Sequence, residues 1–283
     1  MAGTVNEETT GAGRGLAPVV FFLSDSTGIT AETLGNTLLT QFPGPRLERR
    51  SFPFITTEEQ ARDVVAVIDS LAAAGPRPIV FSTAVNREIR EILSQSSGHF
   101  VDLFGSHIGQ LEDVLQIPAS GEPGKAHGVG DAIRYQSRMT AVEYAIEHDD
   151  GQSIRALERA ELILIAPSRC GKTPTTMYLA LQHGILAANF PLIEEDFAGR
   201  ALPKPLQPFV RKCFGLTSLP IRLSQIRQER RPDSQYASLA QCTYELRSAE
   251  DMYRINQVPY VNSASMSVEE ISATILQRMR LHH

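Results

Sequence analysis

The order of apolar and polar residues along the chain predicts short buried strands that alternate with amphipathic helices. Mainly apolar runs of strand length occur at residues 19–24, 78–83, 100–104, 161–165, 185–189, 213–216 and 259–261. The segments between these runs have apolar residues at intervals of three and four, which is the period of a helix with one buried face. Such alternation is typical of an α/β protein with a layered, mainly parallel sheet.

Helices are expected in most of the intervening segments, and two of them begin with capping residues. Thr56 and Glu59 fit a capping box before the second helix, and Ser267 is placed to cap the last one. The expected helices cover residues 29–42, 58–74, 86–95, 108–115, 131–148, 175–183, 219–230, 236–256 and the segment that begins after Ser267.

Prolines and glycines interrupt the regular pattern between residues 116 and 130, which favours a surface loop that forms a domain boundary or a lid. Residues 1–15 hold almost no large apolar side chains and are expected to form a flexible tail. The helix after the loop is assigned to the first domain. We therefore expect a tail at 1–15, an N-terminal α/β layered domain at 16–150 and a C-terminal P-loop kinase-like domain at 151–283.

Composition and charge argue against nucleic acids and membranes as binding partners. The 283-residue chain has a formal net charge of −5, so it lacks the general basic field that draws proteins to nucleic acids or anionic membranes. No apolar run approaches the roughly 20 residues of a membrane-spanning helix, and the N-terminus has no signal-peptide pattern. We expect a cytoplasmic protein that binds neither nucleic acid nor membrane. Its three cysteines have unrelated spacings and are expected to be reduced thiols.

The clearest chemical motif is the segment APSRCGKT, called here the 166–173 loop. Its spacing fits the broad form of the Walker A pattern, and its neighbours place it between a strand and the start of a helix. Backbone N–H groups and the helix dipole then converge on one phosphate-binding site. The expected nucleotide-binding residues are Ala166, Pro167, Ser168, Arg169, Cys170, Gly171, Lys172 and Thr173.

Two residues of this loop are expected to carry chemistry. Lys172 would neutralise the terminal phosphates, and the Thr173 hydroxyl would bind a magnesium ion. Cys170 is expected to be only a small side chain. The loop departs from the common pattern at Ala166, where glycine is usual, and at Pro174, which removes a backbone N–H just after Thr173. We therefore expect the loop to bind a diphosphate tightly and to bind the part of the nucleotide near the ribose more weakly.

Acidic residues end the helix that precedes the predicted nucleotide-binding strand. Asp149 and Asp150 face the negative end of a helix dipole, an arrangement that costs about 0.3–1 kcal/mol for each charge. Because such costs are often accepted at functional sites, we expect Asp149 or Asp150 to act as a general base or as a magnesium ligand. The alternative interpretation is a solvated helix end that terminates at Gly151.

Two further clusters have both a functional and a structural interpretation. Residues 24–28, SDSTG, lie between an apolar run and a helix, which suits either a ligand site at the carboxyl edge of a sheet or simple helix capping. Arg227, Arg230 and Arg231 lie near the end of a predicted helix and could bind phosphate oxygens. A solvated basic face is the simpler interpretation of these arginines.

The chain resembles the bacterial phosphoenolpyruvate synthase regulatory proteins, which are relatives of the pyruvate phosphate dikinase regulatory proteins. The resemblance extends over residues 19–281 and rests on FFLSDSTGITAETLG, SFPF, HDDG, LILIAPSRCGKTPTTMYLA, FGLT, YASLAQC and an NS followed by SVEEI. It implies a bifunctional enzyme that phosphorylates and inactivates its target synthase on a threonine with ADP. It also implies that inorganic phosphate removes this group again as pyrophosphate. The 166–173 loop would then bind ADP.

Within this family, the complete Gly171, Lys172 and Thr173 are similar to the synthase branch, so phosphoenolpyruvate synthase is the expected protein partner. The sequence is also compatible with a homodimer. Two other interpretations of the 166–173 loop stay open. One is a kinase that phosphorylates a small metabolite, and the other is a nucleotide-sensing binding protein that transfers no phosphate.

Overall fold

The computed structural model describes residues 17–44, 47–124 and 132–281, which belong to two compact units. The first unit is Met1–Gly130 and the second is Asp131–His283. The tail expected at residues 1–15 lies outside the described residues. Each unit contains a four-stranded sheet with parallel pairings, so the predicted α/β class with mainly parallel sheets is confirmed.

The sheet of the first unit has the strand order β2-β1-β3-β4. Its strands are β1 (Val20–Leu23), β2 (Arg49–Phe52), β3 (Ile79–Ser82) and β4 (His99–Asp102). The central strands β1 and β3 are almost wholly buried, whereas the two edge strands alternate exposed and half-buried residues. The sequence did not predict β2, because its residues RRSF include two arginines and no fully buried side chain.

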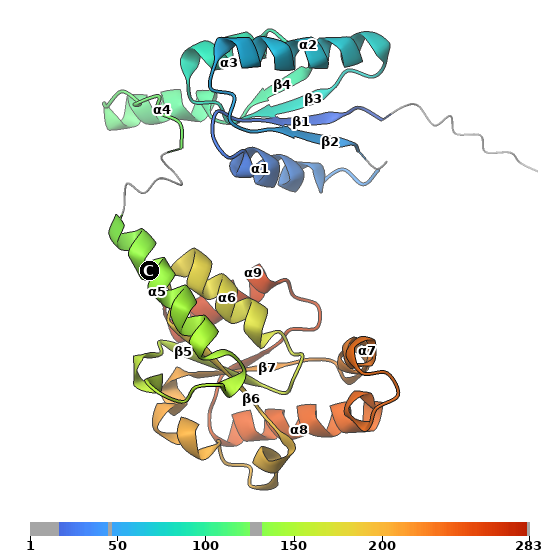
Figure 1. The fold of residues 1–283 in the computed structure, drawn as a ribbon, viewed down its shortest axis with the longest axis vertical. Coiled ribbons are helices and arrows are strands. Elements are labelled where there is room, and N and C mark those ends of the chain that lie inside the picture. The colour runs from blue at the N-terminus through green and yellow to red at the C-terminus, as the bar shows by residue number, and fades with distance from the viewer. Residues whose placement is uncertain (1–16, 45–46, 125–131, 282–283) are drawn as a thin grey trace, which may run out of the picture. The chain divides into compact units, whose positions relative to one another are not determined.

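Helices cover both faces of this sheet (Figure 1). The helix α1 (Ile29–Leu39) lies on one face, and α2 (Glu58–Ala74) and α3 (Arg87–Ser94) lie on the other. A further helix, α4 (Gly105–Leu115), follows β4. After β1 the chain continues into α1 on one face of the sheet, and after β2 it continues into α2 on the other face. The winding of the sheet therefore reverses between the neighbouring strands β1 and β3.

The capping box of α2 lies one residue later than the sequence predicted. Thr57 is the N-cap residue, and its hydroxyl accepts a hydrogen bond from the Gln60 backbone N–H at 3.2 Å. The Gln60 side chain accepts in turn from the Thr57 backbone N–H at 3.1 Å. The predicted pair of Thr56 and Glu59 was wrong, because the sequence TTEEQ offers two overlapping capping patterns.

The sheet of the second unit has the strand order β6-β5-β7-β8, again with parallel pairings. Its strands are β5 (Leu162–Ala166), β6 (Ala187–Pro191), β7 (Cys213–Thr217) and β8 (Tyr260–Asn262). Every residue of β5 and β7 is buried, as expected for central strands that are covered on both faces. Alternate residues of β5 enter two separate apolar clusters, which form the core on the two faces of the sheet.

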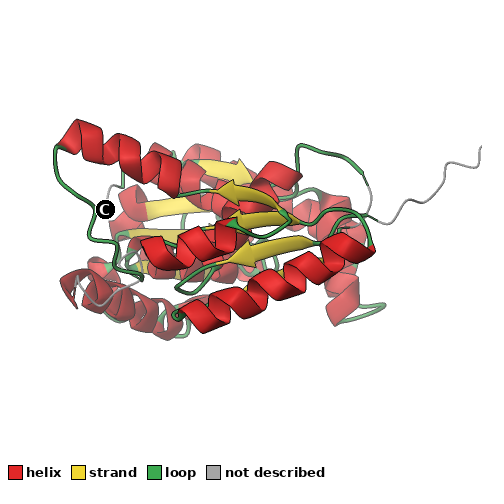
Figure 2. Ribbon diagram, turned by 90° about the horizontal axis from the view of Figure 1, so that it is seen from above, coloured by secondary structure: helices red, strands yellow, loops and turns green. Residues whose placement is uncertain are grey.

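Helices and short 3-10 segments connect these strands (Figure 1). Figure 2 colours the helices red and the strands yellow. The helices are α5 (Ala132–Glu147), α6 (Lys172–His183), α7 (Pro220–Arg230), α8 (Leu239–Ile255) and α9 (Val268–Met279). The 3-10 segments are η1 (Asp149–Gly151), η2 (Leu157–Arg159), η3 (Glu194–Ala198), η4 (Lys204–Lys212) and η5 (Gln235–Ala237). Within the described part of the chain, no helix is long and apolar enough to cross a membrane.

The boundary between the compact units differs from the sequence-based division. The helix α5 packs on α6 through a cluster that contains the buried residues Ala141, Ala145 and Ala180, so α5 belongs to the second unit. The units therefore divide at 130/131, at the end of the glycine- and proline-rich loop, and not at 150/151. Helical periodicity shows that α5 has a buried face, but it does not show which domain covers that face.

A tyrosine fixes the spacing of the two central strands where the 166–173 loop begins. Tyr253 on α8 is fully buried, and its hydroxyl lies 2.8 Å from the Ile165 carbonyl oxygen and 3.2 Å from that of Leu216. Burial raises the pKa of Tyr253 well above its ordinary value, so the hydroxyl keeps the proton that it donates. The ring lies against Gly215, where an added Cβ would come within 2.6 Å of a ring carbon.

Candidate active site

The 166–173 loop joins β5 to α6 at the carboxyl edge of the sheet. Arg169 and Gly171 have left-handed backbone conformations, with φ angles of 71° and 93°. Gly171 is also the N-cap residue of α6, and no side chain caps this helix. The positive φ angle explains why residue 171 is a glycine. Lack of space does not explain it, because an added Cβ would meet no atom within 4 Å. The first backbone N–H groups of α6 can therefore bind an anion.

Lys172 is almost completely buried at the base of this loop. It is 4% exposed, and its Nζ atom lies 3.3 Å from the Ala166 carbonyl oxygen and 3.4 Å from that of Pro167. The Asp150 Oδ1 atom is 3.8 Å away. Burial lowers the pKa of Lys172, and attraction to Asp150 opposes this effect only in part. A phosphate oxygen beside Nζ would stabilise the charged ammonium group.

Asp149 and Asp150 lie in η1, beside this lysine. Asp149 Oδ1 accepts one hydrogen bond from the Thr173 hydroxyl, at 2.8 Å, and another from the side-chain amide of Asn189. Asp150 has a left-handed backbone with a φ angle of 48°, and its side chain is 58% exposed. The structure thus brings the two predicted aspartates together with Lys172 and Thr173.

The residue that joins the two aspartates, Asn189 on β6, was not predicted from the sequence. It is 2% exposed, its Nδ2 group donates to Asp149, and its Oδ1 atom accepts from the Asp150 backbone N–H at 2.8 Å. One buried amide therefore holds both acids in place. The available signal was a polar residue inside the apolar run 185–189, since a buried amide requires hydrogen-bond partners.

His148 fixes the turn that carries the aspartates. It is 1% exposed, with Nδ1 at 2.8 Å from the Tyr144 carbonyl oxygen and Nε2 at 2.6 Å from that of Arg155. Its ring also stacks on the Tyr144 ring, with centroids 3.9 Å apart. Backbone groups occupy both ring nitrogens, so His148 acts as a positioning residue of the HDDG segment.

The structure contradicts a solvated basic face at Arg227. This residue is 0% exposed and forms an ion pair of 2.6 Å with Glu245 on α8. Its guanidinium also donates to the carbonyl oxygens of Ser168 and Tyr236, both at 3.0 Å, and lies over the Tyr236 ring at 4.2 Å from the centroid. Arg227 therefore holds the backbone of the 166–173 loop, and these contacts occupy the group that was considered for phosphate binding.

Two cavities adjoin the loop. The first has a volume of about 270 Å³ and is lined by Asp150, Ile226, Arg230 and residues 168, 169 and 171–174. The second, of about 260 Å³, shares Arg169, Gly171, Pro174 and Ile226 with the first and continues to Arg222, Ser263, Met266 and Ile271. The loop therefore separates a cavity rich in charged groups from one with more apolar side chains.

Cys170 is 2% exposed, and burial raises its pKa to about 12, so its thiol stays neutral. Its carbonyl oxygen accepts a hydrogen bond from the Ser263 hydroxyl at 3.0 Å. These contacts agree with the expectation that Cys170 is a small packing residue. No cluster of three or more His, Cys, Asp or Glu side chains suited to a metal ion occurs among the described residues.

The parallel sheet, the strand–loop–helix connection and the acids beside a buried lysine are the features expected of an α/β phosphotransferase. The chain belongs to the kinase/pyrophosphorylase family, whose model matches residues 20–276. This match confirms the resemblance inferred from the sequence motifs.

Several relatives are similar to this chain over nearly their whole length. They include proteins of Pseudomonas aeruginosa (49% identical over 257 residues), Marinobacter nauticus (48% over 257) and Legionella pneumophila (47% over 258). The alignments cover 90%, 90% and 91% of this chain and 94%, 95% and 95% of the relatives. All three relatives are provisionally named phosphoenolpyruvate synthase regulatory protein.

Proposed function

We propose that this protein regulates phosphoenolpyruvate synthase by phosphorylating one of its threonines and by removing the phosphate again. ADP is the donor in the first reaction, which inactivates the synthase, and inorganic phosphate is the acceptor in the second, which gives pyrophosphate. The family and the names of the relatives support this proposal. The observation that carries it is the exposed carboxylate of Asp150, which lines one cavity with Lys172 and Thr173.

In this proposal, ADP occupies both cavities beside the 166–173 loop. Its phosphates bind in the 270 Å³ cavity, against Lys172 and the first N–H groups of α6, and its nucleoside binds in the 260 Å³ cavity. Arg222 and Ser263 offer polar contacts to the ribose, and Met266 offers an apolar contact to the base. Pro174 lies between the two cavities and has no backbone N–H, so the terminal phosphate is held more firmly than the α-phosphate.

The pair of Asp149 and Thr173 fits a magnesium ion. Magnesium prefers oxygen ligands at 2.0–2.1 Å in octahedral geometry and usually takes few of them from the protein. Neighbouring ligands of such an ion are about 2.9 Å apart, and Asp149 Oδ1 lies 2.8 Å from the Thr173 hydroxyl oxygen. When bound, the ion would be held by Asp149 and Thr173 and would neutralise part of the negative charge of the ADP phosphates.

The two aspartates have different tasks in the phosphorylation step. Asp149 is bonded to Thr173 and Asn189 and would hold magnesium together with Thr173, so it does not serve as the base. Asp150 is exposed to the cavity and takes the proton of the target threonine hydroxyl. The threonine oxygen attacks the terminal phosphorus of ADP, the bond from this phosphorus to the bridging oxygen breaks, and AMP leaves.

The same groups serve the removal of the phosphate. An oxygen of inorganic phosphate attacks the phosphorus of phosphothreonine, and the bond to the threonine oxygen breaks. Asp150 takes the proton of the attacking hydrogen phosphate and passes it to the threonine oxygen as pyrophosphate leaves. Lys172 and the N–H groups of α6 stabilise the negative charge of the transferred group in both directions, so one site can carry out both reactions.

ADP labelled with ³²P in its terminal phosphate tests the proposal. We expect label on a single threonine of phosphoenolpyruvate synthase, together with unlabelled AMP. Asp150→Asn should lower the transfer rate about 10²–10⁴-fold with little change in ADP affinity. Asp233→Asn, which changes an exposed acid of the same unit, is the matched control and should keep the full rate.

The same experiment separates the two alternative functions. Label that enters only an added metabolite, and never the synthase, would show a small-metabolite kinase. A nucleotide-sensing binding protein would inhibit the synthase without any transfer of label. In that case Lys172→Ala, tested with ADP present, would leave the inhibition unchanged.

A further inference from the structure

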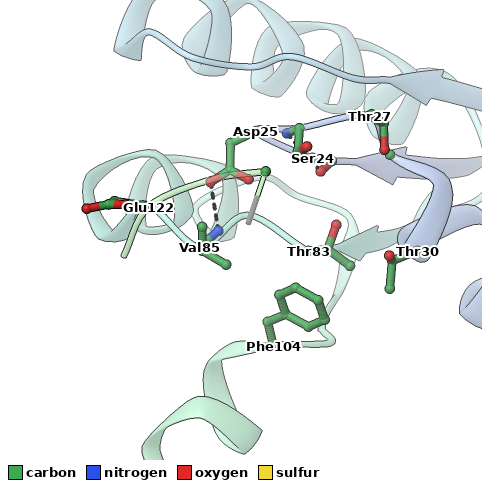
Figure 3. Close-up of a pocket in the computed structure, with 11 residues that line it drawn as sticks. Ser24, Asp25, Thr27, Thr30, Thr83, Val85, Phe104 and Glu122 are labelled. Carbon is green, nitrogen blue, oxygen red and sulfur yellow. Dashed lines mark hydrogen bonds between the residues drawn. The ribbon is translucent and has the colours of Figure 1, made fainter. Parts of the chain in front are cut away.

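The first unit contains a cavity that the proposed reaction does not use. It has a volume of about 170 Å³ and lies at the carboxyl ends of β1 and β3, where the winding of the sheet reverses. Open α/β sheets bind their ligands at this point. Figure 3 shows the side chains around the cavity, among them Ser24, Asp25 and Thr27 from the loop after β1, Thr83 and Val85 from the loop after β3, and Phe104.

The two units follow the same plan around their central strands. In both sheets the first strand lies between the second and the third, in the orders β2-β1-β3-β4 and β6-β5-β7-β8. The next helix has a glycine N-cap with left-handed backbone in each unit, Gly28 with a φ angle of 79° and Gly171 with a φ angle of 93°. Neither helix has a side-chain cap. The cavity therefore has the same topological position in its sheet as the 166–173 loop has in the other.

Two residues with little exposed surface, Ser24 and Thr83, present hydroxyl groups to this cavity that can donate hydrogen bonds to a ligand. Thr83 is 4% exposed, and its hydroxyl has no hydrogen-bond partner among the described residues. Its oxygen lies on the side that faces Ser24 (Figure 3). Ser24 is 3% exposed and accepts from the Ser26 backbone N–H at 3.1 Å, which leaves its own hydrogen for a ligand. Both side chains belong to buried residues that line the cavity, so their hydroxyl hydrogens are available to an acceptor on a ligand.

Asp25 adds a buried acceptor to these donors. It is 4% exposed, and its Oδ2 atom accepts from the backbone N–H groups of Val85 and Asn86 at 2.7 and 2.9 Å. Its Oδ1 atom has no partner within the described ranges. The described lining contains no lysine or arginine, and its other acid, Glu122, is exposed. The hydroxyl donors and the uncapped N-terminus of α1 suit an oxyanion, and the Asp25 carboxylate requires that this oxyanion also has one hydrogen to donate.

We propose that this cavity binds a phosphate group that carries a proton. The hydroxyls of Ser24 and Thr83 and the first N–H groups of α1 donate to the phosphate oxygens, and Asp25 Oδ1 accepts the hydrogen of the phosphate P–OH group. Sulfate has no hydrogen at neutral pH, so one of its oxygens would face the Asp25 carboxylate and be repelled. The proposal does not rest on the reaction proposed for the 166–173 loop, because its residues all belong to the first unit.

Asp25→Asn changes the selectivity without removing the local structure. The asparagine oxygen can keep the hydrogen bonds from Val85 and Asn86, while its amide nitrogen replaces the acceptor Oδ1 with a donor. We expect this variant to lose its preference for phosphate and to bind sulfate at least as tightly. A purely structural role of Asp25 would weaken both anions equally.

Thr83→Val removes the hydroxyl and keeps the shape of the side chain. We expect phosphate to bind about tenfold more weakly, or worse, because a hydrogen bond to a charged group is lost. Without anion, the unfolding temperature should stay the same or rise, since the hydroxyl has no partner to lose. Thr37→Val, at an exposed hydroxyl on α1, is the matched control and should not change binding.

Equilibrium dialysis with ³²P-labelled inorganic phosphate tests the proposal on the full chain. Lys172→Ala serves as the parent, so that binding at the 166–173 loop is weakened. We expect one phosphate per chain, little displacement by equimolar sulfate, and loss of binding when Thr83→Val is added. Phenyl phosphate is then added as a competitor. If it displaces the label, the site accepts phosphate esters; if it does not, the site binds inorganic phosphate alone. Equal competition by sulfate, unchanged binding in the Thr83 and Asp25 variants, or no binding to the parent would each overturn the proposal.

Discussion

Replacing Arg227 with methionine should destabilise the second unit and weaken nucleotide binding at the same time. The guanidinium is fully buried and paired with Glu245, whose side chain is 12% exposed. Burial alone lowers the pKa of Arg227, but its hydrogen bond and ion pair with Glu245 outweigh this effect and raise the pKa, so the arginine is charged. Methionine would leave the Glu245 carboxylate and the Ser168 carbonyl without their common donor.

The size of the effect follows from the cost of an uncompensated buried charge. Removing one partner of a buried ion pair costs about 3–5 kcal/mol. For a unit of this size, each kcal/mol lowers the unfolding temperature by about 2–4 °C, so the total decrease should be roughly 6–20 °C. Affinity for ADP should also fall, because the Ser168 carbonyl would no longer hold the 166–173 loop.

Scanning calorimetry of four proteins tests this reasoning. Arg227→Met is compared with the unchanged chain, with Arg227→Met combined with Glu245→Met, and with Arg254→Met. The last variant breaks an exposed ion pair with Asp251 and should cost no more than about 1 kcal/mol. The double variant removes both buried charges and should be more stable than Arg227→Met alone. If Arg227→Met behaves like Arg254→Met, or the double variant is the least stable, the argument is refuted.

Three further predictions concern the 166–173 loop and its neighbours. Burial lowers the pKa of Lys172 in the folded chain below the value of 10.5 that applies to the unfolded chain. At a pH between these two values, the unfolded chain binds a proton that the folded chain has released. The free energy of unfolding therefore rises as the pH rises through this range. Lys172→Met should abolish this rise in calorimetric scans and should increase the unfolding temperature at neutral pH; an unchanged pH profile would contradict the burial argument. Asn189→Ala should lower kcat for phosphotransfer by up to about 100-fold and change the KM for ADP much less. A raised KM with an unchanged kcat would show that Asn189 acts only on binding. Gly171→Ala should cost about 1–2 kcal/mol because of its positive φ angle, whereas Gly199→Ala, with equal space and a φ angle of −114°, should cost less in the same denaturant titration.

Strands that are buried at every position gave the clearest signal in the sequence. The strands β5 and β7 are buried at every position, so their sequences are continuous apolar runs. The 166–173 loop could also be predicted from the sequence, because its glycine, lysine and threonine occur at a fixed spacing after such a run. In contrast, the edge strand β2 begins with two arginines, and its pairing with β1 depends on backbone groups that leave no pattern in the sequence.

Contacts between distant residues account for what the sequence did not predict. Three arginines at helical spacing are normally a solvated surface, and only the folded chain brings Glu245 from α8 against Arg227. Asn189 looks like an interruption of an apolar strand until the turn with Asp149 and Asp150 is placed beside it. The division between the compact units likewise depends on α5, whose apolar face gave no information about its partner helix.

The contact between Gly215 and Tyr253 limits how this chain can change in evolution. The tyrosine ring fills the space that any side chain on residue 215 would need, and its hydroxyl bonds to the backbone of both central strands. A change at residue 215 alone creates a clash, and a smaller residue in place of Tyr253 leaves a cavity. We therefore expect the two positions to be retained or exchanged together in related chains. Selection for phosphotransfer would thus act on a pair of residues that do not line either cavity beside the loop.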